Sequence, residues 1–151
     1  VLLGMALAVS DYHYAAVYRD QAQRLIRQAP QGSNVWFIGH WGWQWYAKQE
    51  GMKPYDPKRT ELAAGDYLVQ PKRIHGSSIA DRHHARLTRF VEITVEASPW
   101  LWLRTIAVRP PGGFYSFFLN NRAPPWRFST DPVEQFVIYR VVVGETAGHS
   151  K

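Results

Sequence analysis

The sequence predicts one domain that is α/β in its first half and β-rich in its second half, between the α/β and α+β classes. In the first half, a helical stretch, a short apolar run and a second helical stretch follow one another. This alternation is the beginning of an α/β layer. In the second half, apolar runs are separated by Pro and Gly turns, which is typical of antiparallel strands. With 151 residues, of which 46% are hydrophobic, the chain has material for one core.

The first predicted element after the amino end is a helix. Ser10 or Asp11 can cap its start, and Pro30 ends it because proline cannot continue a helix. The polar turn 31–34 follows. The run VWFIG at 35–39 is apolar and bounded by turn residues, so it predicts a short buried strand.

Residues 40–50 predict a second helix, and Gly51 fits the position just past its end. The run GDYLVQP at 65–71 predicts a second buried strand. Because a helix separates the strands at 35–39 and 65–71, we expect them to pair in parallel through a right-handed crossover.

The second half contains several more predicted strands, which we expect to form an antiparallel meander. They are separated by Ser98-Pro99 and by the PPGG turn at 110–113. The strands are expected at 89–97, 101–108, 114–120 and 135–143.

The amino end carries an apolar stretch. Residues 1–9 contain no charge, but they are fewer than the roughly 20 needed to span a bilayer, and no basic region precedes them. Tyr12, Tyr14 and Tyr18 follow, and tyrosines collect where a membrane helix meets the head groups. We therefore expect 1–9 to be the end of a transmembrane helix. A buried amphipathic helix is the alternative.

The net charge is +6, which favours an anionic partner such as phospholipid head groups or a phosphorylated ligand. The nearest approach to a basic cluster lies in 71–89 and includes Arg82, Arg86 and Arg89. No nucleic-acid-binding motif accompanies the charge, so we expect no nucleic-acid partner. The absence of cysteine excludes disulfides, thiol catalysis and Cys-based zinc sites.

The stretch GHWGWQWY at 39–46 is the strongest candidate for a binding site. A Gly-rich turn between a strand and a helix can present backbone N–H groups to a ligand at the carboxyl end of a sheet, so we consider Gly39, His40, Trp41 and Gly42. The alternative is that the glycines only permit a tight turn and close helix packing. The dinucleotide-binding pattern is absent.

The tryptophans of this stretch predict two faces of one helix. Trp41 and Trp45 are four residues apart and share a face, which we expect to pack on the sheet. Trp43 then points away, toward a ligand, a membrane or a partner.

Metal and catalytic sets are weak in this sequence. His83 and His84 are adjacent and would point apart, and Asp81 is not aligned with either. Ser77 and Ser78 lie near these residues, but no nucleophile-elbow motif is present. We therefore predict no metal site, no cofactor and no catalytic residue in this chain.

The stretch from Asn34 to Pro71 resembles the carboxyl-terminal soluble region of bacterial membrane proteins related to the dolichyl-phosphate-mannose protein mannosyltransferases, the glycosyltransferase family 39-like proteins. In that family a last membrane helix is followed by a helix, a Gly-His-Trp-Gly segment and a Gly-Asp strand. The resemblance covers about a third of the chain and stops at Lys72. The matching residues are Gly39, His40, Trp41, Gly42, Gln44 and Tyr46.

The resemblance implies a periplasmic module without catalytic function. These enzymes use a polyprenyl-phosphate sugar, and their catalytic acids lie in an early loop between membrane helices, which has no counterpart here. We therefore expect 1–9 to end a membrane helix, 10–144 to form one soluble extracytoplasmic domain and 145–151 to be a flexible tail. The domain would recognise or dock an acceptor or a lipid phosphate. The alternative is a membrane-tethered accessory subunit that contacts membrane lipids and other integral membrane subunits.

Overall fold

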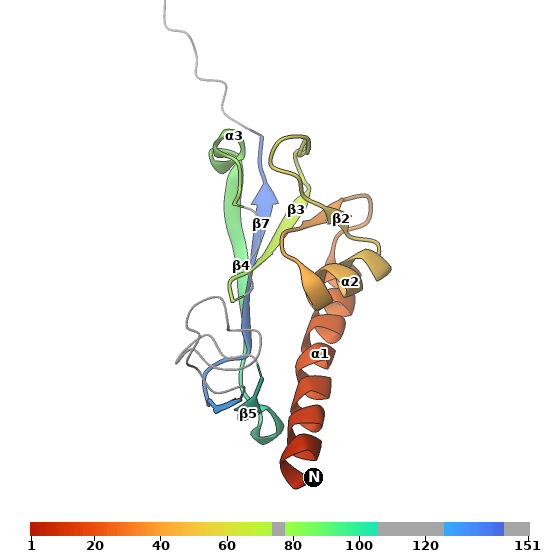
Figure 1. The fold of residues 1–151 in the computed structure, drawn as a ribbon. Coiled ribbons are helices and arrows are strands. Elements are labelled where there is room, and N and C mark those ends of the chain that lie inside the picture. The colour runs from red at the N-terminus through yellow and green to blue at the C-terminus, as the bar shows by residue number, and fades with distance from the viewer. Residues whose placement is uncertain (74–77, 106–125, 144–151) are drawn as a thin grey trace, which may run out of the picture.

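The computed structural model describes residues 1–73, 78–105 and 126–143, and the protein is a mixed α/β structure built around a mixed sheet (Figure 1). This confirms the predicted mixture of helices with parallel and antiparallel strands. The elements in chain order are α1 (Leu2–Gln28), β1 (Val35–Phe37), α2 (Trp41–Gln49), β2 (Lys53–Pro54), β3 (Tyr67–Pro71), α3 (Asp81–His84), β4 (Leu87–Val95), the 3₁₀ turn η1 (Pro99–Leu101), β5 (Leu103–Arg104), β6 (Arg127–Phe128) and β7 (Glu134–Val141).

The main sheet has the strand order β2-β1-β3-β7-β4. The pairing of β1 with β3 is parallel, as predicted, and the two-residue β2 adds a second parallel partner to β1. Strand β7 is antiparallel to both β3 and β4. The last strand of the described chain therefore lies between β3 and β4, and β5 and β6 form a separate pair.

Strand β3 is buried on both faces of the sheet. Val69 faces the cluster that includes Phe37 and Phe136, on which α1 packs with Ala22 and Leu25. Its neighbour on β3, Leu68, faces the opposite cluster. Alternate residues of a strand point to opposite faces, so a run that is apolar throughout is the signature of such a strand. The second cluster contains Ile38, Tyr55, Leu62, Leu68, Ile79 and Val141.

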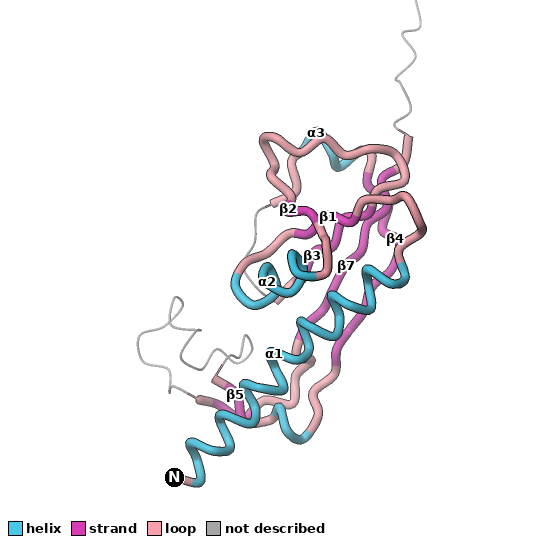
Figure 2. The backbone as a smooth tube through the Cα atoms, turned by 90° about the vertical axis from the view of Figure 1, so that its right-hand side faces the viewer, coloured by secondary structure: helices cyan, strands magenta, loops and turns pink. Residues whose placement is uncertain are grey.

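The β4–β7 ladder extends beyond the shorter strands β1 and β3, and α1 runs beside it (Figures 1 and 2). The first half of α1 lies beside η1 and β5, and the last turns lie over the main sheet. The amino end of α1 and the short helix α3 are at opposite ends of the structure (Figure 1).

Four sequence predictions need correction or remain outside the described residues. The first helix begins at Leu2, not at Ser10 or Asp11, because the apolar stretch is rich in helix formers and continues into the later turns without a break. Strand β5 is limited to Leu103 and Arg104 among the described residues. The strand predicted at 114–120 and the tail 145–151 lie outside the described residues.

None of the helices in the described ranges is both long enough and apolar enough to cross a bilayer. That residues 1–9 end a membrane helix stays a prediction.

Candidate functional site

The Gly39-His40-Trp41-Gly42 turn connects the carboxyl end of β1 to α2, the position at which the sequence predicts a ligand. Gly39 has a φ of 120° and Trp41 a φ of 58°, and His40 between them is extended, so positive φ occurs at two of these three residues. Such a conformation at a bulky residue costs of order 1–3 kcal/mol. A side chain at Gly42 would meet nothing within 4 Å, so this glycine is not required for close packing.

The predicted faces of α2 are reversed in the structure. Trp41 and Trp45 are 55% and 63% exposed, whereas Trp43 is completely buried. Its indole Nε1 donates to the carbonyl of Ile38 at 2.9 Å. Trp43 therefore belongs to the core and not to a binding surface.

The orientation of α2 on the sheet decides which face is buried. The buried positions are Trp43 and Ala47, which are four residues apart. The small Ala47 lets the helix approach the core, and the ring of Trp43 lies 5.1 Å from that of Phe136. The spacing of Trp43 and Ala47 is the signal in the sequence that could have identified this face.

A buried carboxylate that was not predicted from the sequence lies near the carboxyl end of β3. Glu134, the first residue of β7, is fully buried. Its Oε1 accepts backbone N–H bonds from Arg73 and Gln135 at 2.8 Å each and from Lys72 at 3.2 Å. Its Oε2 accepts the hydroxyl of Tyr18 at 3.0 Å. We call this arrangement the Glu134 socket.

Tyr14 extends the socket by one hydroxyl. It lies one helical turn before Tyr18, and the two oxygens are 2.9 Å apart. Because the Tyr18 proton is directed at Glu134, the Tyr14 hydroxyl is the donor in this pair. Tyr14 and Tyr18 therefore hold α1 against β7. Tyr18 is 4% exposed and belongs to the core, in contrast to the exposed position that the sequence predicts.

Burial sets the protonation of the socket. It raises the pKa of Glu134 above its ordinary value, although the backbone N–H bonds and the Tyr18 hydroxyl act in the opposite direction. Burial also raises the pKa of Tyr14 to about 12, against a lowering effect of the Tyr18 hydrogen bond. Burial raises the pKa of Tyr18 further still. Both tyrosines are therefore neutral donors at neutral pH.

The socket has the chemistry of a structural clamp. Its carboxylate already accepts four hydrogen bonds, which fills its usual acceptor capacity. With Glu134 fully buried, neither oxygen is open to a substrate. What the socket does is join α1, the start of β7 and the backbone just after β3.

A second buried acid, Asp66, organises the turn before β3. Its Oδ1 accepts from the backbone and side-chain nitrogens of Asn34, and its Oδ2 accepts from the indole of Trp36 and the backbone of Ala63. Burial alone would raise the pKa of Asp66, but these hydrogen bonds outweigh burial and lower it. Asp66 is thus a charged structural residue.

The predicted basic residues lie on α3 (Arg82), between α3 and β4 (Arg86) and on β4 (Arg89). Arg82 is exposed and donates to the Thr60 carbonyl and the His83 ring, whereas Arg89 forms an ion pair with Glu92. His83 is buried, and burial together with the nearby charges of Arg82 and Arg86 lowers its pKa. The structure therefore brings Arg82 and Arg86 together around His83, while Arg89 is paired separately.

His83 has a second ring contact, with Tyr55. Its Nδ1 lies 2.8 Å from the Tyr55 hydroxyl, which also accepts the backbone N–H of Ala80 at 3.0 Å. Since the Arg82 guanidinium donates to Nε2, a neutral His83 carries its proton on Nδ1 and donates to Tyr55. These bonds fix α3 to the loop that follows β2.

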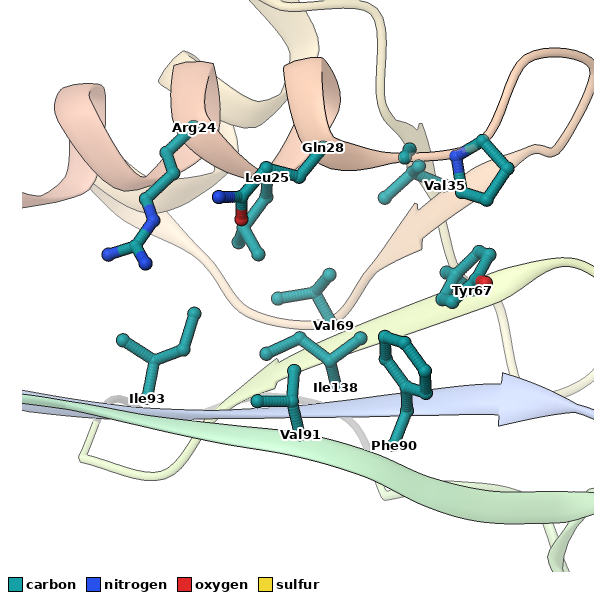
Figure 3. A pocket seen from close by; sticks show the side chains of 12 residues that line it. Arg24, Leu25, Gln28, Val35, Tyr67, Val69, Phe90, Val91, Ile93 and Ile138 are labelled. Carbon is teal, nitrogen blue, oxygen red and sulfur yellow. The ribbon is translucent and has the colours of Figure 1, made fainter.

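A groove of about 180 Å³ lies between the last turns of α1 and the sheet (Figure 3). Arg24 and Gln28 overhang it from α1, and Val91 and Ile138 form part of its apolar floor (Figure 3). Small-molecule sites usually measure about 300–1,000 Å³. The groove is below that range, and none of the predicted site residues lines it.

Within the described residues, no three His, Asp or Glu side chains come together as a possible metal site. No family model matches the chain, and no curated protein or solved structure matches it. The resemblance to the mannosyltransferase-related proteins therefore stays a prediction.

The first turns of α1 are the largest apolar surface on that helix. The exposed side chains occur on all sides of the helix, which carries no charged side chain before Asp11. From Tyr14 onward, by contrast, one face of the same helix packs on the core. The exposed residues are Val1, Leu2, Leu3, Met5, Val9 and Tyr12.

Proposed function

We propose that the chain is a non-catalytic extracytoplasmic module of a glycosyltransferase-like membrane protein, and that it docks an acceptor or a partner while the amino end of α1 contacts the bilayer. The observation that carries this proposal is the division of α1 into two parts. Its first turns are uncharged and exposed, and its later turns pack on the core without a break in the helix. A helix that is apolar all round is normally buried in a membrane or in protein.

The absence of open chemical groups supports a non-catalytic role. The Glu134 socket is closed, Asp66 is occupied by structural hydrogen bonds, and the ring nitrogens of His83 both have partners. These three buried groups are thus engaged in structural hydrogen bonds.

The positions of the charges favour docking over recognition of a lipid phosphate in the same membrane. Arg82 belongs to α3, at the opposite end of the structure from the amino end of α1 (Figure 1). Arg86 lies close enough to His83 to lower the pKa of that residue. An acidic acceptor or partner could meet this end of the domain while the other end contacts lipid.

Flotation with vesicles tests the membrane contact. We expect residues 1–151 to float with phosphatidylcholine vesicles and residues 11–151 to float much less. The shorter chain keeps Tyr14 and Tyr18 and hence the Glu134 socket, and circular dichroism checks that it is folded. Equal flotation of the two chains would overturn the proposed contact.

An accessory subunit of an integral membrane complex is the second candidate, favoured by exposed apolar surface that another protein could cover just as a bilayer could. The mass of the native protein extracted with detergent separates the two. A mass several times 17.4 kDa supports the transferase-like protein, and a mass near 17.4 kDa supports the subunit.

A further inference from the structure

A second set of exposed aromatic residues lies beside the first half of α1, although it is far away in the sequence. Trp100, in η1, is 65% exposed, and its ring stacks on that of His13 with centroids 6.0 Å apart and an interplanar angle of 24°. Asp11 accepts a hydrogen bond from Thr105. The segment that contains η1 and β5 is thus fixed to α1 at two positions.

The pairing of β5 with β6 brings Phe128 next to this segment, which also carries Trp102. Phe128 on β6 pairs with Leu103 on β5, and the backbone of Ser129 donates to the carbonyl of Trp102 at 2.8 Å. Trp102 and Phe128 are both exposed. We call Tyr12, Trp100, Trp102 and Phe128 the aromatic collar.

The collar lies beside the part of α1 that directly follows its uncharged turns. Uncharged turns come first, up to Ser10, and the contacts with the collar segment follow at Asp11 and His13. The first Arg or Lys of α1 comes only at Arg19. An apolar stretch followed by aromatic residues and only later by Arg is typical of a helix that leaves a bilayer.

We propose that the aromatic collar is a second membrane contact, seated in the interfacial region of a phospholipid bilayer beside the first turns of α1. This inference rests on the proposed function and adds to it a contact from a different part of the chain. Trp has an apolar ring body and a polar N–H, which suits the boundary between acyl chains and head groups.

The chemistry of the collar favours lipid over a protein partner. Its members are all aromatic. The segments that carry them contain charges of both signs, which are the acids Asp11 and Asp131 and the bases Arg104 and Arg127. A contact of this kind depends on burial of aromatic surface more than on charge. We therefore expect binding to neutral phosphatidylcholine vesicles and little loss of it in high salt.

The absence of cysteine permits a direct test. An environment-sensitive fluorophore is attached to one introduced cysteine in the full chain: Leu3→Cys for the helix, Trp100→Cys for the collar or Trp45→Cys as the control. Trp45 is 63% exposed, close to the 65% of Trp100, but it lies on α2. The vesicles are phosphatidylcholine with a quencher on the acyl chain.

We expect the labels at positions 3 and 100 to shift to the blue and to be quenched by the lipid, and the label at position 45 to stay unchanged. If position 3 is quenched and position 100 is not, the collar proposal is wrong and the proposed function stands. If neither responds, both fail. A shift at position 100 that depends on protein concentration without vesicles indicates a second copy and also overturns the proposal.

A variant series gives an independent measurement. Replacing Trp100 and Trp102 together with Ser should weaken partition into the vesicles by about tenfold, whereas Trp45→Ser should leave it unchanged. These side chains are exposed, so both variants should keep the circular dichroism of the parent chain. Equal partition of the two variants would overturn the collar contact.

Discussion

The hydroxyl of Tyr18 on α1 donates to Oε2 of Glu134 on β7 at 3.0 Å, across 116 residues of sequence. On the other carboxylate oxygen, three backbone N–H groups complete the socket. The side chain of Glu134 therefore connects α1, the start of β7 and the residues after β3 through hydrogen bonds. This makes Glu134 the most informative position for stability measurements.

Glu134→Gln should show how the buried charge affects stability with pH. Since the folded pKa is raised above its ordinary value of 4.5, the contribution of Glu134 is fully present below about pH 4.5 and is lost as the pH rises through the folded pKa. Gln is never charged, and its amide oxygen can still accept from the backbone N–H groups. In urea unfolding at pH 4 and pH 8, the free energy of unfolding of the Gln variant should therefore increase relative to that of the parent chain as the pH rises. A constant difference would contradict the raised pKa.

Glu134→Ala should have a different effect from Glu134→Gln. It leaves the three backbone N–H groups and the Tyr18 hydroxyl without their acceptor. We expect a loss of about 3 kcal/mol in the free energy of unfolding at pH 4, which becomes smaller as the pH rises through the folded pKa of Glu134. If Ala and Gln are equally stable at pH 4, the socket does not hold the structure together.

Trp43→Ala should be strongly destabilising, and Trp45→Ala should not. The first removes a fully buried indole and its hydrogen bond to Ile38, for an expected loss of about 4 kcal/mol. The second changes an exposed side chain on the same helix, with an expected effect within about 0.5 kcal/mol. Chemical denaturation of both variants measures the difference. The reverse order of stability would restore the face predicted from the sequence.

Asp66→Asn should cost about 2 kcal/mol at neutral pH, because the amide NH₂ group would face N–H donors where a carboxylate oxygen now accepts two hydrogen bonds. The folded pKa is lowered, so the contribution of the charge is present above the ordinary value of 3.8 and is lost as the pH falls through the folded pKa. The gap between the two proteins should thus narrow toward pH 2–3 in urea unfolding experiments. A gap that widens in acid would contradict this role.

Trp41→Gly should stabilise the protein by about 1 kcal/mol, because glycine adopts a φ of 58° without strain and the exposed indole contributes little packing. Thermal unfolding measures this, with Trp45→Gly in the regular part of α2 as a control that should be destabilising by about 1 kcal/mol. Loss of stability at position 41 would mean that the indole makes contacts that outweigh the strain.

The sequence contained enough information for the parallel pair but not for the socket. The apolar runs at β1 and β3, with a helix between them, are local patterns, and their parallel pairing is confirmed. The position of β7 between β3 and β4 depends on pairings across the whole chain, such as that of Val69 with Ile138. Local periodicity carries no information on such a partner.

The site residues show the same limit. Gly39 and His40 lie at the carboxyl end of β1 as predicted, because the strand and the helix were both recognised. The prediction that Trp45 and not Trp43 is buried was wrong, because the buried face depends on the orientation of α2 on the sheet. Glu134 was not identified at all, since an acid at the start of a strand is common in sequences. Its structural role depends on the hydrogen bond from Tyr18, which is distant in the sequence.

The continuity of α1 has a mechanical consequence. Its 27 residues form a rod of about 40 Å, and the Tyr18 hydrogen bond joins the middle of that rod to β7. From Met5 to Gln28 the rod contains neither glycine nor proline to act as a hinge. A tilt imposed on α1 at Met5 is therefore transmitted to the main sheet, and it also changes the direction in which Arg82 and α3 point.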